Sequence, residues 1–139
     1  MRKEIPVIEG VRRPDSPFSH VVRAGDFLFL TSQLSADLRT GRIIRGTIEE
    51  QTKRALDNIQ FLLQASGSTM NDVVKTVIYM RDLSKFKEMN AVYGKYFKRG
   101  EEPARVTVQA PSPIEGIDIE IEVTAIVPSI NQRQQPKSE

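Results

Sequence analysis

The chain has 139 residues, of which 39% are hydrophobic and 27% charged, and its formal net charge is +2. This length and composition are typical of one globular domain and exclude a disordered or fibrous protein. The small net charge gives no reason to expect nucleic-acid binding, and the absence of cysteine excludes disulfides, thiolate metal sites and a cysteine nucleophile. The single histidine, His20, rules out a multi-histidine metal site within one chain and is expected to be structural or exposed.

We expect no export signal at the amino terminus. The first residues lack the apolar stretch that directs export, and no apolar run approaches the length of a membrane span. We therefore expect a cytoplasmic protein with one domain over residues 1–127. Residues 128–139 are polar and aperiodic, and we expect them to form a disordered tail.

Period-two alternation and runs of β-branched residues predict six strands. In chain order these are residues 5–8, 18–24, 27–31, 73–80, 103–109 and 118–123. The first is weakened by its proline, and Gly25-Asp26 is expected to turn the second into the third. The third is apolar on both sides, which is typical of a central strand that is covered on both faces.

Two helices are expected between these strands. Thr47 and Glu50 fit a capping box, an apolar stripe follows at helical spacing, and Gly67 is placed to end the first helix. The second helix is expected from about Asp82 to Gly100, with an aromatic and methionine stripe that packs in the core. The fold class is therefore α+β, a two-layer sandwich in which two helices cover one face of a mixed five- to six-stranded sheet. The other face still carries apolar residues, so we expect a homo-oligomer to cover it.

The last two strands, with a Pro- and Gly-containing turn between them, predict an antiparallel hairpin. Pairing Ala110 with Ile117 would place Thr107 opposite Glu120 and Arg105 opposite Glu122. Arg105, Thr107, Glu120 and Glu122 would then share one face, with a guanidinium that can grip a carboxylate beside a carboxylate that can move a proton. On pattern alone, a solvated face with a surface Arg–Glu pair is the favoured interpretation.

Several blocks of sequence, in order and at matching spacing, resemble one known family. They are Ala24 to Gln33, Gln51 to Leu63, Asp72 to Val77, Met89 to Tyr93, Pro103-Ala104-Arg105 and Ile119 to Glu122. Over roughly residues 5–127 the chain is similar to the RidA/YjgF/UK114 family of reactive intermediate (enamine/imine) deaminases.

The resemblance implies a chorismate-mutase-like trimer with clefts at the subunit interfaces, each built from two chains. It implies hydrolysis of 2-imino acids, formed from enamines such as 2-aminoacrylate, to 2-keto acids and ammonia without a cofactor or metal. Arg105 would hold the substrate carboxylate and Glu120 would activate the water, which makes these two the catalytic residues. Thr107 would contribute its main chain, and Phe18, Ser32 and Gln33 would complete the substrate-binding residues.

The chain departs from the family pattern at three of these positions. Phe18 stands where many family deaminases carry tyrosine, Ser32 where glycine is usual, and Thr107 where cysteine is usual. These changes suggest an altered or weakened substrate preference. Three alternatives stay open: a different substrate such as an aminomuconate-type compound, a non-catalytic module that binds keto or amino acids, and an RNA-acting or chaperone-like role.

Overall fold

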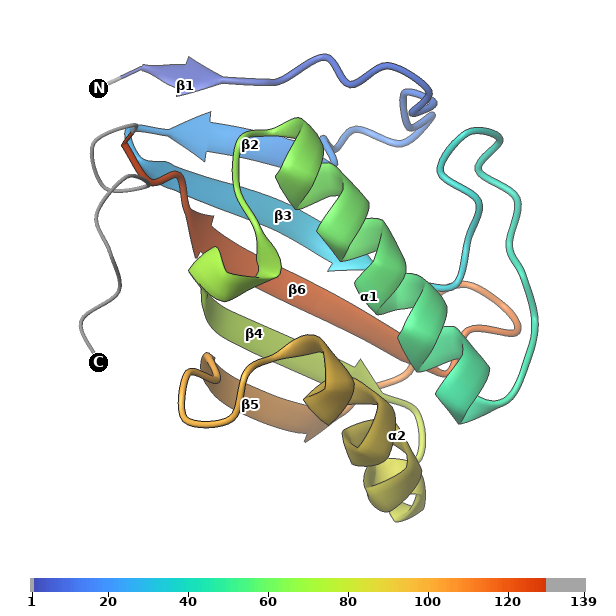
Figure 1. Cartoon of the computed structure of the whole chain (residues 1–139). Coiled ribbons are helices and arrows are strands. Elements are labelled where there is room, and N and C mark those ends of the chain that lie inside the picture. Colours follow the sequence, from blue (N-terminus) through green and yellow to red (C-terminus); the bar gives the residue numbers. More distant parts are fainter. Residues whose placement is uncertain (1, 130–139) are drawn as a thin grey trace.

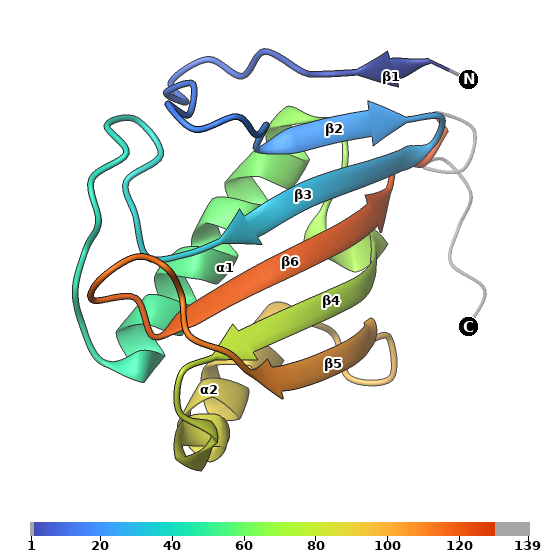
Figure 2. The ribbon, with the colours of Figure 1, turned by 180° about the vertical axis from the view of Figure 1, so that it is seen from behind.

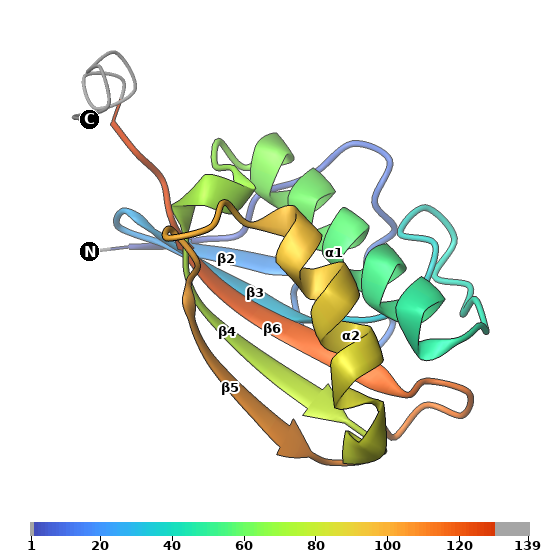
Figure 3. The same cartoon turned by 60° about the horizontal axis from the view of Figure 1, so that its bottom comes forward.

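The computed structural model describes residues 2–129, in which six strands form one mixed sheet in the order β1-β2-β3-β6-β4-β5. The strands are β1 (Lys3–Glu4), β2 (Val21–Ala24), β3 (Phe27–Gln33), β4 (Val73–Met80), β5 (Ala104–Gln109) and β6 (Ile119–Ile126). Helices α1 (Ile48–Ala65) and α2 (Phe86–Tyr93) lie across the front of the sheet in Figure 1, and Figure 2 shows the sheet from behind. Figure 3 shows both helices on the same side, so the expected two-layer α+β class is confirmed.

The core lies between the helices and one face of the sheet. Alternate residues of β6, from Ile119 to Ala125, are buried, as are Ile78 and Met80 of β4. The apolar stripe of α1 packs onto them through side chains that are almost fully buried: Ala55, Leu56, Ile59, Leu62 and Leu63. Each buried aliphatic side chain of this size contributes roughly 1.5–3 kcal/mol, so this layer holds the fold together.

The ends of α1 are those expected from its sequence. Thr47 is the N-cap: its side chain accepts a hydrogen bond from the main-chain N–H of Glu50, whose side chain accepts one from the N–H of Thr47. Gly67 follows the C-cap with a φ of 87°, a conformation that favours glycine. The predicted caps are therefore confirmed.

The second helix is shorter than expected. A 3₁₀ turn at Leu83–Lys85, capped by Asp82, leads into α2, which ends at Tyr93 instead of near Gly100. A second 3₁₀ turn, Gly94–Tyr96, carries the chain onward, and Phe97 beyond it is still buried. The aromatic and methionine stripe led to the prediction of one continuous helix up to Gly100. Apolar residues three positions apart also suit a 3₁₀ turn, so the stripe does not distinguish the two.

The predicted strand at residues 5–8 is wrong, since the structure places a two-residue strand, β1, at Lys3–Glu4. It pairs with β2 at the edge of the sheet. Pro6 has no N–H to donate to a ladder, which explains why pairing stops before it.

The predicted hairpin of the last two strands is also wrong. β4 lies between β5 and β6, pairing in parallel with β5 and antiparallel with β6. The segment from Ala110 to Asp118 therefore crosses one strand instead of forming a tight turn. Alternation of apolar and polar residues determines which residues of a strand share a face. It does not determine which strand lies next to it, because β4 alternates in the same way and can pair with β5 or β6 equally well.

The insertion of β4 separates the residues that were expected to share one face. Arg105 pairs with the buried Thr76, so Arg105 and Thr107 lie on the side of the sheet that carries the helices. Glu120 pairs with Tyr79, and Glu122 with Val77, on the opposite face. The single polar patch of Arg105, Thr107, Glu120 and Glu122 does not exist within one chain.

The face turned toward the viewer in Figure 2, here called the open face, carries no helix. Large apolar side chains are exposed there, with Phe27 at 45%, Phe29 at 46%, Val106 at 48% and Val108 at 37%. Within one chain β3 is thus covered on one face only, contrary to the expectation from its apolar pattern. No helix between Arg2 and Ser129 is long and apolar enough to cross a membrane. The predicted tail lies outside the described residues from position 130 onward.

Candidate functional site

The predicted site residues fall into two groups. Ser32 and Glu120 meet on the open face, and Phe18 and Gln33 line a cavity next to Ser32. Arg105 and Thr107 lie on β5, at the edge of the sheet and on its other face.

The first group is organised by an irregularity in β3. Leu30 pairs with Val123 and Gln33 with Ile121, so two residues, Thr31 and Ser32, stand opposite one residue of β6. Such a bulge commonly redirects a side chain at a functional position. Here the Ser32 hydroxyl donates a hydrogen bond of 2.6 Å to Oε1 of Glu120. This short contact fixes the carboxylate in a part-buried position.

A cavity of about 390 Å³ begins at Ser32. Its walls come from the segment before β2, the end of β3, the loop that follows β3 and the tip of the β5–β6 segment. Phe18, His20, Gln33 and Ile114 are among its lining residues. Phe18 is 49% exposed and meets the His20 ring edge-on, with ring centroids 5.8 Å apart.

His20, expected to be structural or exposed, is a half-buried part of this wall. Nε2 of the buried Gln33 lies 3.2 Å from Nδ1 of His20 and 3.3 Å from the carbonyl oxygen of Thr31. The carbonyl can only accept, so this nitrogen is the amide donor and Nδ1 accepts its second hydrogen. His20 is thereby held as the neutral tautomer with its proton on Nε2. Burial lowers the pKa of His20 below its ordinary value of 6.5, which favours the same form.

Tyr79 lies beside two carboxylates of the open face, those of Glu120 and Glu122. The Tyr79 hydroxyl lies 3.4 Å from Oε1 of Glu122, and Tyr79 is also the register partner of Glu120. Burial, together with the nearby carboxylates of Glu122 and Glu120, raises the pKa of Tyr79 above its ordinary value of 10. The phenol therefore stays protonated and serves as a donor on the open face.

In the second group, the guanidinium of Arg105 is held in a fixed orientation. It lies 4.9 Å from the ring centroid of Tyr93 and 5.4 Å from that of Phe86, and its Nη1 donates to Oδ1 of Asn90 at 2.6 Å. Its Nε and Nη2 atoms have no partner among the described residues. Those two atoms form the edge of the fork that binds a carboxylate with two parallel hydrogen bonds.

Thr107 adds a main-chain donor at the same edge. The N–H of Ala110 donates to the carbonyl of Met80, so alternation along β5 turns the amides of Arg105, Thr107 and Gln109 away from β4. β5 is the last strand of the sheet, and we expect the N–H of Thr107 to point at open space beside the Arg105 guanidinium.

The two groups cannot meet around one small molecule within a single chain. β6 and β5 are separated by β4, a distance of roughly 10 Å across two strand spacings, and the side chains leave opposite faces. No cluster of three or more His, Cys, Asp or Glu side chains suited to a metal ion occurs in residues 2–129. The chain therefore carries two half-sites. One is the guanidinium of Arg105 at the edge of the sheet, which can bind a carboxylate. The other is the pair of Ser32 and Glu120 on the open face, where Ser32 lines the cavity.

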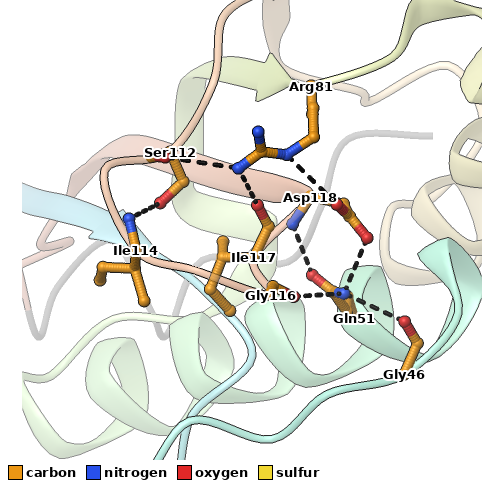
Figure 4. A network of polar contacts seen from close by, with 8 residues as sticks. All are labelled: Gly46, Gln51, Arg81, Ser112, Ile114, Gly116, Ile117 and Asp118. Atoms are coloured by element: carbon orange, nitrogen blue, oxygen red, sulfur yellow. Dashed lines mark hydrogen bonds and ion pairs between the residues drawn. The ribbon is translucent and has the colours of Figure 1, made fainter.

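The segment between β5 and β6 is anchored by the network in Figure 4. Nε2 of the buried Gln51 lies within 3.2 Å of the carbonyl oxygens of Gly46 and Gly116 and of Oδ2 of Asp118, while its Oε1 accepts the N–H of Asp118. Arg81 completes it through an ion pair with Asp118 and contacts with the carbonyls of Ser112 and Ile117. Through Gly116 and Asp118, this network ties the segment that carries Ile114, part of the cavity wall, to Gln51 near the start of α1.

Sequence reasoning missed Asn90, Phe86 and Tyr93 as residues that orient Arg105. Phe86 and Tyr93 were assigned to the core stripe of the second helix, and Tyr93 is indeed buried. The signal that was present is the helical spacing of Phe86, Asn90 and Tyr93, which places them along one side of α2. Only the parallel pairing of β5 with β4 reveals that Arg105 lies against that side.

Comparison with known proteins places the chain in a family. A family model described as Endoribonuclease L-PSP matches residues 11–127. A RutC family protein of Pyrococcus horikoshii is 40% identical over 88% of this chain and 97% of its own length. The protein named Reactive Intermediate Deaminase A, chloroplastic, of Arabidopsis thaliana is 35% identical over 90% of this chain and 66% of its own length.

A solved structure of a Rid-family protein of unknown function from Yersinia pestis has a TM-score of 0.83 and 30% sequence identity, covering 91% of this chain and all of its own. The agreement thus extends from short motifs to the entire arrangement of strands and helices. The chain belongs to the Endoribonuclease L-PSP family, the RidA/YjgF group that its sequence motifs resemble.

Proposed function

We propose that the chain is a cofactor-free deaminase that hydrolyses 2-imino acids, formed from enamines such as 2-aminoacrylate, to 2-keto acids and ammonia. The observation that carries this proposal is the 2.6 Å contact that holds Glu120 against Ser32, a residue that lines the cavity. A carboxylate fixed beside an open cavity can accept a proton from a water molecule placed there. The name of the Arabidopsis relative supports the same chemistry.

In this mechanism the water oxygen attacks the imine carbon while Glu120 accepts a proton from the water. The attack breaks the carbon–nitrogen π bond, and Glu120 passes this proton to the nitrogen, which gives a tetrahedral carbinolamine. Glu120 then takes the hydroxyl proton as the carbon–oxygen double bond forms and delivers it to the nitrogen as the carbon–nitrogen single bond breaks, so the products are the keto acid and ammonia. The free edge of the Arg105 guanidinium holds the substrate carboxylate, and the N–H of Thr107 lies close to it. Binding the carboxylate fixes the imine carbon relative to the water, which lowers the entropic part of the barrier.

We further propose that Arg105 and Glu120 act in one site only across an interface, in a homotrimer. Each half-site of a chain would meet the complementary half-site of a neighbouring copy. Two features support this: the half-sites lie on opposite faces of the sheet, and the open face exposes phenylalanine and valine side chains that a second copy would cover.

The first experiment measures hydrolysis of 2-iminobutanoate and 2-iminopropanoate, formed in place by a threonine or serine dehydratase. Semicarbazide traps the imine that escapes, so a deaminase lowers the trapped fraction. We expect the wild type to lower it and Arg105→Ala to reduce kcat/KM about a hundredfold or more, because two charge-assisted hydrogen bonds to the substrate are lost. Glu120→Gln should reduce kcat more than KM.

Two matched variants control for general effects of lost charge. Arg42→Ala removes an exposed guanidinium that has no partner in the part of the chain that the structure describes, and Glu49→Gln neutralises an exposed carboxylate on α1. Both should match the wild type. If the wild type does not lower trapping but binds keto acids in a manner abolished by Arg105→Ala, the chain is a ligand sensor instead. Salt-dependent RNA binding that Arg105→Ala leaves intact would favour the RNA-acting role.

A further inference from the structure

The cavity lined by Ser32, the hydrogen-bond partner of Glu120, is larger than a small 2-imino acid requires. Its volume is about 390 Å³. Cavities of roughly 300–1,000 Å³ usually hold drug-sized molecules, whereas 2-iminopropanoate has only about six non-hydrogen atoms. A substrate whose reacting carbon lies near Glu120 could therefore extend a longer side chain past Ser32 into the cavity.

The charged residues of the cavity wall leave one cation uncompensated. Asp15 is paired with Arg12 at 3.2 Å, and Asp37 with Arg39 at 3.6 Å. The side chain of Arg13 has neither an ion pair nor a hydrogen bond within the described part of the chain. Arg13 also lines the adjoining cavity of about 320 Å³, so it stands where the two cavities meet. The wall thus includes an exposed arginine whose charge no carboxylate of the described residues pairs with.

His20 presents a directed donor from the same wall. Its Nδ1 accepts from Gln33, so the proton is on Nε2, and Nε2 has no partner in residues 2–129. Among the described residues, Ser66 Oγ is the one buried side-chain nitrogen or oxygen atom without a partner. Nε2 of His20 therefore keeps contact with solvent. Like Arg13, His20 lines both cavities.

We propose that this cavity is a subsite for a second carboxylate of the substrate, with Arg13 supplying the countercharge and Nε2–H of His20 a hydrogen bond. The substrate class is then the 2-imino dicarboxylic acids. The inference rests on the proposed function for its reacting centre: Arg105 of a second copy holds the carboxylate next to the imine, and the distal carboxylate reaches Arg13 and His20. The two charge-assisted contacts select a dicarboxylate over a shorter monocarboxylate.

The test compares two imines that share a reacting centre. 2-Iminoglutarate, formed in place by an oxidase acting on glutamate, is compared with 2-iminobutanoate, and the measured quantity is the ratio of their kcat/KM values. The wild type should favour 2-iminoglutarate. Arg13→Gln should lower the ratio about tenfold, the size expected for one lost charge-assisted contact, mainly by raising KM for the dicarboxylate. Arg42→Gln, which changes an exposed arginine outside the cavity wall, should leave the ratio unchanged.

Two variants of His20 separate its donor from its structural role. The amide oxygen of asparagine can replace Nδ1 as the acceptor for Gln33, but asparagine has no group at the place of Nε2. Glutamine reaches that place with an N–H donor. We expect His20→Asn to lower the ratio and His20→Gln to restore part of it. Equal ratios in the wild type, Arg13→Gln and His20→Asn would overturn the subsite.

The outcome for the subsite is separable from the outcome for the proposed function. Arg105→Ala should lower kcat/KM for both imines about a hundredfold or more if the deaminase proposal holds, whatever the ratio shows. If neither imine is hydrolysed, calorimetric binding of 2-oxoglutarate and of 2-oxobutanoate tests the subsite directly. Tighter binding of 2-oxoglutarate that Arg13→Gln weakens would support it, and equal binding of the two acids would overturn it.

Discussion

Ser32 determines where the Glu120 carboxylate lies, because its hydroxyl is the donor at 2.6 Å. Ser32→Ala removes the donor without adding bulk. We expect kcat for imine hydrolysis to fall about tenfold, since a hydrogen bond to a charged group contributes roughly 1.5–3 kcal/mol and its loss frees the carboxylate to rotate. Ser84→Ala, at an exposed position that neither lines the cavity nor contacts Glu120, is the control. An unchanged kcat in Ser32→Ala would show that the contact does not position Glu120.

His20 couples the cavity wall to pH. Burial lowers its pKa in the folded state below 6.5, the ordinary value in an unfolded chain. Between the lowered value and 6.5 the unfolded chain binds more protons, so the free energy of unfolding decreases as the pH falls through that window. Above 6.5 the contribution is complete. Protonation would also set Nδ1–H against the amide of Gln33.

The measurement is urea unfolding at a series of pH values from 7.5 downward. The wild type should lose stability on acidification through this window, and His20→Gln, which does not titrate, should lack that component. All other titratable side chains are common to both proteins, so their contribution cancels in the comparison. Parallel curves for the two proteins would contradict the prediction.

Some residues of the candidate site could be predicted from the sequence, and others could be found only from the structure. Arg105, Ser32 and Glu120 could be selected from the motif resemblance, because it gives residue identities at fixed spacing. The rings and amide that orient Arg105, and the Gln33–His20 contact, could not. They depend on which side of a strand faces which helix, and that follows from strand pairing between residues far apart in the chain.

Among the elements, β5 shows what period-two alternation predicts about a strand and what it does not. The alternation correctly separated Val106 and Val108 from Arg105 and Thr107. It does not predict their burial: the valines are 48% and 37% exposed, because β5 is an edge strand with its apolar side on the open face. Helix α1, by contrast, was predicted with its caps, since a capping box and a C′ glycine are local signals.

The segment between β5 and β6 depends on one buried amide. Gln51→Leu keeps the volume of the side chain but removes the partner of the Asp118 N–H and of the carbonyls of Gly116 and Gly46. We expect the free energy of unfolding to fall by about 2–4 kcal/mol, because part-buried polar groups lose their partners. Gln64→Leu on the exposed side of the same helix is the control and should change stability by less than about 0.5 kcal/mol.

Denaturant unfolding measures both variants. A Gln51→Leu protein as stable as Gln64→Leu would mean that water replaces the lost contacts at no cost. The Arg81–Asp118 ion pair in the same network is about half exposed, so it cannot account for a loss of this size.

The whole molecule has a sheet with one covered and one uncovered face. Phe27, Phe29, Val106 and Val108 expose apolar surface on the open face, which favours association with further copies. We expect light scattering to give the mass of a trimer and Phe29→Glu to shift it toward the monomer, because a charge would be buried in the interface. Phe61→Glu, on the outer side of α1 and 48% exposed, should leave the mass unchanged. A monomeric wild type would contradict the interface proposal.

If each site combines Arg105 of one copy with Glu120 of another, two inactive variants should complement each other. Arg105→Ala and Glu120→Gln chains are mixed, unfolded and refolded together, then assayed for imine hydrolysis. At equal amounts, a site has an intact Arg105 on one side and an intact Glu120 on the other with a probability of about one quarter, so about a quarter of wild-type activity should return. Each variant refolded alone is the control. A site contained within one chain would give no recovery, because every chain in the mixture lacks one of the two residues. Recovery therefore distinguishes a shared site from a local one, independently of which imine is the natural substrate.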